Sequence, residues 1–168
     1  QSAIWSVASR RVPREQREQR FTIGHVAMAP RAGDLVLARL DAIGFHGDLQ
    51  TPSGRTRKLL PGDEIVAVYG YCSTPSQFEA VVPKTIGPCQ LVSASGIAGK
   101  AISWHARAAC GPTLITPMGY LLRADGERAN LADFALEPLA APDGVLPPAI
   151  AIAGTSPDSG TTTTAAFL

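Results

Sequence analysis

The sequence is poor in charged residues, in aromatic residues and in long apolar runs. Asp, Glu, Lys and Arg make up 17% of the 168 residues, and Phe, Trp and Tyr make up 6%. No apolar run approaches the ~18 residues that a membrane-spanning helix requires. The formal net charge of +1 provides no general attraction to nucleic acid or to an anionic membrane. We therefore expect no membrane partner, and the scarce aromatic residues also count against nucleic-acid binding.

Cysteine is scarce as well, and motifs for catalysis are missing. Cys72, Cys89 and Cys110 are odd in number and widely spaced, which argues against a disulfide framework and against a zinc site. The sequence has no Gly-x-Ser-x-Gly elbow and no pair of carboxylates spaced for acid–base work, so the catalytic residues are unknown. Reduced thiols are the expectation for a cytoplasmic protein.

Glycine and proline are plentiful, with 16 and 14 copies, which favours short strands and turns over long helices. Between residues 21 and 83, apolar segments such as 34–43 and 64–71 are separated by the turn sequences PSG at 52–54 and PGD at 61–63. Strands at such regular spacing predict an antiparallel β module that resembles a small barrel or sandwich.

A second module is predicted over residues 89–136, where the apolar segment 89–93 precedes a glycine-containing loop. Residues 101–109 (AISWHARAA) contain good helix formers, so we predict a helix there and a small α/β module overall. Lys100 and Ser103 stand beside this loop and could contact an anion. The alternative, which we favour, is that Gly96 and Gly99 permit a tight turn from strand to helix.

Basic residues occur in two places. Residues 1–20 form a basic N-terminal arm, in which Ile4, Trp5 and Val7 suggest a short strand or anchor. We interpret residues 10–20 as a solvated helix or mobile segment, because glutamates dilute their arginines. Arg55, Arg57 and Lys58 follow the predicted hairpin turn, where charge on an edge strand opposes aggregation. The three histidines, His25, His46 and His105, have no partner visible in the sequence and are expected in structural or exposed positions.

The C-terminal stretch carries the clearest chemical signal. A proline-rich linker over residues 137–147 precedes the apolar run 149–153, a small polar loop and four threonines. Strand, glycine-rich loop and helix start form the layout of a phosphate-binding loop, in which backbone N–H groups and the helix N-terminus cradle anionic oxygens. The whole chain is therefore predicted to be mixed α+β, with the β module, the α/β module and then the first strand and loop of a P-loop domain at 148–168.

Gly154-Thr155-Ser156, with Asp158 and Gly160, resembles the loop of the dethiobiotin-synthetase-like P-loop proteins, whose pattern is G-T-x-x-x-x-G-K-T. Thr161 stands where that family has the lysine that reaches the β- and γ-phosphates. The resemblance implies ATP or GTP as ligand, with Mg2+ bound by Thr162. The nucleotide-binding residues that it implies are Gly154, Thr155, Asp158, Ser159, Gly160, Thr161 and Thr162.

Two functions follow from these patterns. The first is the substrate-binding or regulatory N-terminal region of a P-loop nucleotide-binding protein with kinase- or ligase-like activity, whose partners are the nucleotide and a small-molecule substrate or a protein. This chain itself would not be catalytic, because a P-loop domain also needs a parallel sheet and a second acidic motif. The second is a non-enzymatic binding or assembly protein with a degenerate P-loop tail. A flexible Gly/Ser/Thr-rich tail is the structural alternative for the loop itself.

Overall fold

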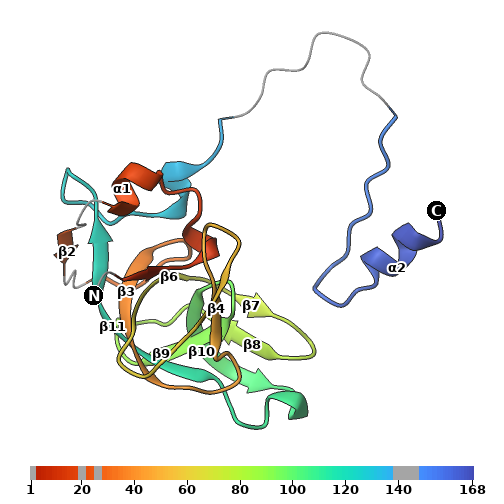
Figure 1. Cartoon of the computed structure of the whole chain (residues 1–168), viewed down its shortest axis with the longest axis horizontal. Coiled ribbons are helices and arrows are strands. Elements are labelled where there is room, and N and C mark those ends of the chain that lie inside the picture. Colours follow the sequence, from red (N-terminus) through yellow and green to blue (C-terminus); the bar gives the residue numbers. More distant parts are fainter. Residues whose placement is uncertain (1–2, 19–21, 25–27, 138–147) are drawn as a thin grey trace.

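Strands dominate the structure, a computed structural model that describes residues 3–18, 22–24, 28–137 and 148–168 (Figure 1). The strands are β1 (Ile4–Trp5), β2 (Thr22–Gly24), β3 (Leu35–Ala42), β4 (Asp48–Gln50), β5 (Thr56–Lys58), β6 (Glu64–Tyr69), β7 (Cys72–Ser73), β8 (Phe78–Val81), β9 (Cys89–Ser93), β10 (Ile97–Trp104) and β11 (Thr113–Leu122). The short helices are η1 (Val7–Ser9), α1 (Arg14–Glu18), η2 (Ala106–Ala108), η3 (Leu131–Phe134) and α2 (Thr161–Ala166), where η marks a 3-10 turn.

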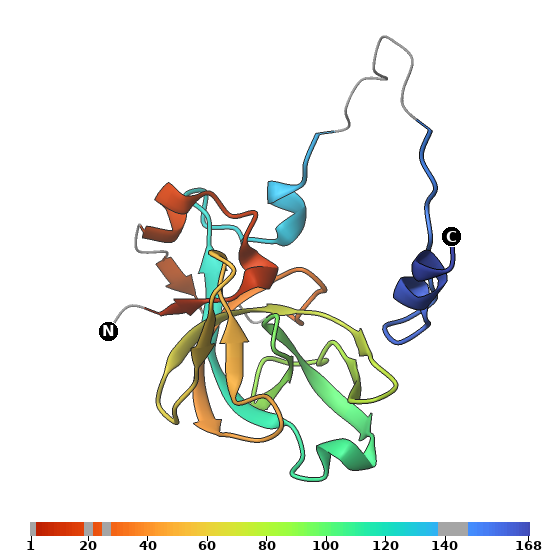
Figure 2. The ribbon, with the colours of Figure 1, turned by 45° about the vertical axis from the view of Figure 1, so that its right-hand side comes forward.

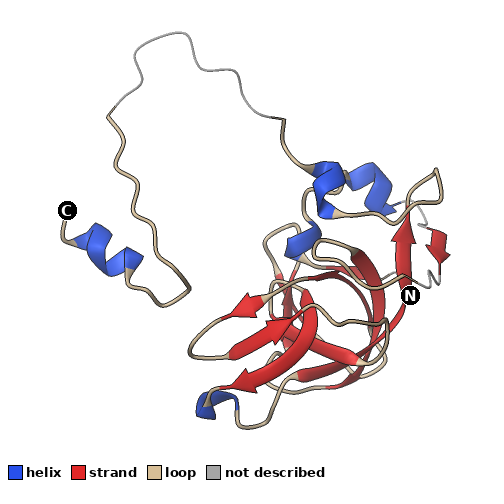
Figure 3. Cartoon of the chain, turned by 180° about the vertical axis from the view of Figure 1, so that it is seen from behind, coloured by secondary structure: helices blue, strands red, loops and turns tan. Residues whose placement is uncertain are grey.

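Nine of the strands in the described part of the chain form one mixed sheet (Figure 3). Its order is β1-β6-β3-β11-β9-β10-β8-β7, and β2 pairs with β11. Two pairings, β1 with β6 and β10 with β6, are parallel, and the others are antiparallel. Because β10 pairs with both β9 and β6, the hydrogen-bonded path that leaves β6 through β3, β11 and β9 returns to β6. β4 and β5 form a separate two-stranded ribbon.

The two central strands, β3 and β6, are buried on both faces. Along β3, Val36, Ala38 and Leu40 enter one core, while Leu35 and Leu37 enter a second core on the opposite face. This division follows from the alternation of side chains along a strand. A strand with both faces covered carries an unbroken apolar run, as the LVLA of β3 and the IVAVY of β6 do.

The second core is covered by the N-terminal segment and by η3. Val12 is fully buried there, and Trp5 and Ala8 of the same segment pack against it together with Leu131 and Phe134 of η3. The parallel pairing of β1 with β6 holds this segment in place, since Ser6 N also donates to Val66 O (3.2 Å). The short strand expected near Ile4 and Trp5 is thus present as β1. The solvated segment predicted for residues 10–20 fits the exposed residues 10, 11 and 13–16, whereas Val12 contributes to the core.

The helix predicted over residues 101–109 is wrong, because β10 runs to Trp104 and is followed only by the single turn of η2. β10 bonds to three neighbours, β6, β8 and β9, and these tertiary pairings outweigh the modest helix preference of alanine. The strands expected as two modules, 21–83 and 89–136, pair with one another in the same sheet, and this sheet is mixed rather than antiparallel. Residues 149–153, predicted as a strand, are not paired in the described structure.

Candidate functional site

The candidate site is the glycine-rich loop that leads into α2, drawn in blue in Figure 2. Asp158 (φ 65°) is the one non-glycine residue with a positive φ in the described part of the chain, and Gly160 (φ 86°) is also left-handed. Left-handed residues on either side of Ser159 alternate the direction of the backbone. Such turns gather successive N–H groups on one side and make anion-binding concavities.

The loop folds back on its own first glycine. A Cβ atom on Gly154 would clash with Ser159 Oγ, and it would lie 2.8 Å from Ser159 Cβ and 3.0 Å from Thr161 Cγ2. Only glycine fits at this position without a shift of the neighbouring atoms. The loop is thus a closed turn, and the first and last members of the motif lie side by side.

The helix after the loop begins where the motif requires it. α2 starts at Thr161 with Gly160 as N-cap, and the first helical bond runs from Thr164 N to Gly160 O (2.9 Å). The Thr164 hydroxyl donates to the same carbonyl (3.1 Å). Among the predicted ligands, Thr162 is exposed in the first turn and Thr161 is half-buried.

The electrostatics of the loop depend on its backbone. Residues 148–168 contain no lysine or arginine, and Asp158 is their one acidic side chain. Asp158 Oδ2 accepts a hydrogen bond from Ser76 Oγ (2.6 Å), which lies in the turn between β7 and β8. The partial positive charge of the N–H groups is therefore the only electropositive feature that these residues themselves supply.

Of the residues predicted to bind nucleotide, the structure brings Gly154, Ser159 and Thr161 close together. Thr155 and Gly160 are exposed. In the described ranges, no group of three or more His, Cys, Asp or Glu residues could hold a metal ion. No helix in those same ranges has the length and apolar character needed to cross a membrane.

The second glycine-rich segment forms a turn between two strands. Gly96 (φ 98°) closes the turn between β9 and β10, where Gly96 N donates to Ser93 O (3.0 Å) and a Cβ would clash with Ser6. Lys100 is exposed on β10, and Ser103 Oγ donates to Glu79 Oε2 (3.0 Å). The glycine therefore serves a turn and a close approach of the N-terminal segment.

The remaining basic and histidine candidates are dispersed. Arg55, Arg57 and Lys58 are exposed on and beside β5. His105 is exposed, and its Nδ1 accepts from Arg107 N (3.1 Å) at the start of η2. His25 lies outside the described residues.

His46 is buried, which sequence reasoning did not predict. Its ring lies 5.1 Å from the Phe45 ring and 5.5 Å from the Phe78 ring, centroid to centroid. Burial lowers the pKa of His46, and a hydrogen bond with the backbone of Val92 opposes this effect. The sequence signal that could have indicated burial of His46 is its aromatic neighbour, Phe45.

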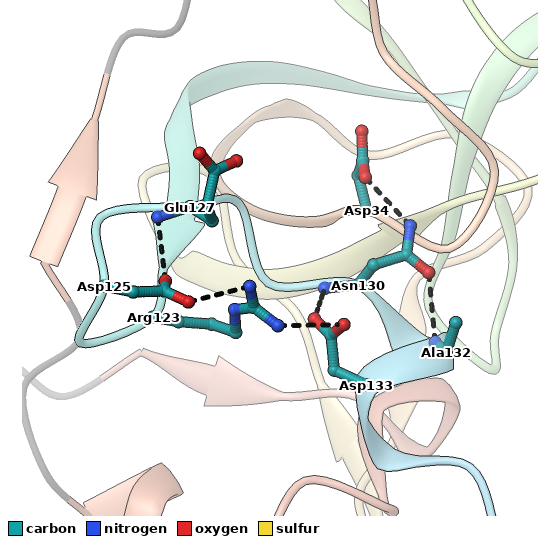
Figure 4. Close-up of polar contacts among 7 residues, drawn as sticks. All are labelled: Asp34, Arg123, Asp125, Glu127, Asn130, Ala132 and Asp133. Atoms are coloured by element: carbon teal, nitrogen blue, oxygen red, sulfur yellow. Dashed lines mark hydrogen bonds and ion pairs between the residues drawn. The ribbon is translucent and has the colours of Figure 1, made fainter.

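A buried polar cluster near the end of β11 was also missed, and Figure 4 shows its contact between Asp34 and Asn130. Arg128 Nη1 donates to Asp34 Oδ2 (2.9 Å), and Asn130 Nδ2 donates to Asp34 Oδ1 (2.9 Å). The Arg128 guanidinium also lies 4.9 Å from the centre of the Tyr120 ring. Burial raises the pKa of the Tyr120 hydroxyl and that of the neighbouring Tyr69 hydroxyl. Since the Asp34 carboxylate is already satisfied by protein groups, we interpret the cluster as a structural clasp between the start of β3 and the segment after β11.

Comparisons with protein-family models, with curated proteins and with solved structures gave no match for this chain.

Proposed function

We propose that residues 154–162 bind the phosphates of ATP or GTP, and that the β-rich region before them is the substrate-binding or regulatory part of a P-loop nucleotide-binding protein. The observation that carries this proposal is the close approach of Gly154 to Ser159 and Thr161. A flexible linker of similar composition would not require a glycine there. By resemblance, the chemistry of the complete protein is kinase- or ligase-like activation of a small molecule, with this chain itself not catalytic.

Phosphate contacts would come from the backbone N–H groups of Gly154, Ser159, Gly160 and Thr161. Thr161 supplies no positive charge, so the loop lacks the attraction that a lysine would add. Two unit charges 4 Å apart interact by about 1 kcal/mol in water and about 4 kcal/mol near a protein surface. Because this loop is exposed, we expect the lower part of that range, which corresponds to about a tenfold difference in affinity.

Magnesium would enter with the nucleotide. Mg2+ in nucleotide sites takes one or two protein oxygens and fills its remaining positions with phosphates and water. The Thr162 hydroxyl, exposed in the first turn of α2, fits the role of such a single oxygen ligand.

We infer further that the sheet acts as a barrel-like module that the linker 137–147 joins to the P-loop segment 148–168. The pairing of β10 with both β9 and β6 supports a barrel-like description, because it connects the first and last members of a run of strands. In a barrel-like module the loops at the ends of the strands are available to bind a substrate or a protein partner.

Calorimetric titration of the chain with MgATP and MgGTP tests the proposal. We expect weak binding that tightens about tenfold in Thr161→Lys, since the added ammonium attracts the phosphates. Gly154→Ala should abolish binding because its Cβ clashes with Ser159. Gly87→Ala is the matched control, since no atom lies within 4 Å of the Cβ it adds. Equal, undetectable binding by the chain and by Thr161→Lys would refute the proposal.

The second candidate function is a non-enzymatic binding or assembly protein with a degenerate P-loop tail. The threonine at the lysine position favours it, as does the exposure of Ile150, Phe167 and Leu168, which leaves apolar side chains free for a protein partner. Retention of a partner by variants that cannot bind nucleotide would support this alternative.

A further inference from the structure

The turn between β7 and β8 meets the phosphate-binding loop, and the two lie side by side in Figures 1 and 2. Ser76 Oγ, at the tip of this turn, donates to Asp158 Oδ2 across 2.6 Å. The contact joins residues 82 positions apart in the sequence. It is a charge-assisted hydrogen bond of the short kind that a hydroxyl forms with a carboxylate.

The β7–β8 turn is held firmly by its own hydrogen bonds. Thr74 N donates to Phe78 O (3.0 Å), and Gln77 N donates to Thr74 O (2.9 Å). His105 N, at the end of β10, donates to Gln77 O (2.9 Å). Phe78 anchors the turn in the core with 1% of its surface exposed. Ser76 is thus presented from a fixed position on the sheet.

We propose that the β7–β8 turn is the docking surface for the phosphate-binding loop and that Ser76 is a positioning residue for Asp158. The Ser76 hydroxyl holds the Asp158 carboxylate toward the sheet, so that the carboxylate does not occupy the loop's own N–H groups. The docking is inferred from the hydrogen bond between Ser76 and Asp158 alone. The effect of this hydrogen bond on nucleotide affinity rests on the proposed function.

Docking predicts fast disulfide trapping between the two positions. The test uses the full chain with Ser76→Cys and Asp158→Cys in a background of Cys72→Ser and Cys110→Ser. The control replaces Ser76→Cys by Ser53→Cys, a serine in the comparable turn between β4 and β5. We expect the Ser76 pair to oxidise at least tenfold faster than the control pair at equal redox potential. Equal rates would overturn the docking surface, whether or not the chain binds nucleotide.

The positioning role is measured separately by MgATP titration of Ser76→Ala and Ser76→Thr. Loss of the hydroxyl frees a carboxylate that competes with phosphate for the loop, so Ser76→Ala should weaken binding about threefold. Ser76→Thr keeps a hydroxyl and should restore the affinity, with circular dichroism confirming that both variants fold. Unchanged affinity in Ser76→Ala would overturn the positioning role while leaving the proposed function intact. If neither the starting chain nor Thr161→Lys binds nucleotide but the trap forms, the proposed function fails and the docking stands.

Discussion

Replacing Asp34 by alanine should destabilise the protein severely. The Asp34 side chain is fully buried, and it accepts hydrogen bonds from Arg128 Nη1 (2.9 Å), Asn130 Nδ2 (2.9 Å) and Arg31 N (2.8 Å). The Arg128 side chain is 3% exposed, so Asp34→Ala leaves an uncompensated charge in the interior. Breaking one side of a buried pair costs about 3–5 kcal/mol. Domains of this size have a free energy of unfolding of about 5–15 kcal/mol, so the loss is a large fraction of the total.

Urea unfolding followed by circular dichroism measures this loss. With a denaturant slope of about 2 kcal/mol per molar, the midpoint should fall by about 1.5–2.5 M. Asp41→Ala is the matched control, because the Asp41–Arg39 pair (3.5 Å) is solvent-exposed. An exposed pair contributes about 0–1 kcal/mol.

The double variant Asp34→Ala with Arg128→Met shows whether the loss of stability comes from the unpaired charge or from lost packing. Removing the guanidinium also removes the unpaired charge, so the double variant should be more stable than Asp34→Ala alone. The reasoning is refuted if Asp34→Ala costs no more than Asp41→Ala. A double variant that loses as much as the two single changes added together would show that packing, and not the buried charge, causes the loss.

Two further predictions concern the histidine and cysteine side chains. Because burial lowers the pKa of His46 in the folded protein, its neutral form favours the fold. This contribution is complete above the unfolded pKa of about 6.5 and is lost as the pH falls from there to the folded pKa, by at most about 1.4 kcal/mol per pH unit. Urea midpoints from pH 7.5 to pH 5 should show this loss in the chain and in His105→Asn, whereas His46→Asn should lack it. Burial raises the pKa of the Cys89 thiol to about 12, so at pH 8 its thiolate fraction is about a thousandfold lower than that of an ordinary thiol. Mass spectrometry after brief alkylation should find Cys110, which is exposed, labelled and Cys89 unlabelled until urea is added.

The central strands could be predicted from the sequence because their signal is local. Residues 34–43 and 64–71 are mostly apolar and are bounded by glycine and proline turns, and β3 and β6 lie within these ranges. Their parallel and antiparallel partners could not be predicted, since pairing depends on segments far apart in the sequence. The parallel contacts of β6 with β1 and β10 arise in this way.

The buried polar residues were beyond prediction for a related reason. Gly33-Asp34 indicates a turn, and Arg31 N does donate to Asp34 Oδ2 as such a turn requires. Nothing near Asp34 in the sequence identifies Arg128 as its ion-pair partner, because the two meet only when the segment after β11 returns to the start of β3. The hydrogen-bond partners of a buried carboxylate come from segments that meet only in the tertiary structure.

Two glycine-rich segments looked alike in the sequence, and the availability of strand partners explains why they differ in the structure. Residues 101–109 contain good helix formers such as Ala101 and Ala106, yet residues 97–104 form β10 because β6, β8 and β9 satisfy their backbone groups. Residues 161–166 begin with four threonines, which are poor helix formers, yet they form α2. No described strand lies alongside them to bond, so their backbone groups pair locally, and Thr164 Oγ1 adds its bond to Gly160 O (3.1 Å). Backbone hydrogen bonding therefore determines the secondary structure of both segments, and the intrinsic preference of their side chains determines it in neither.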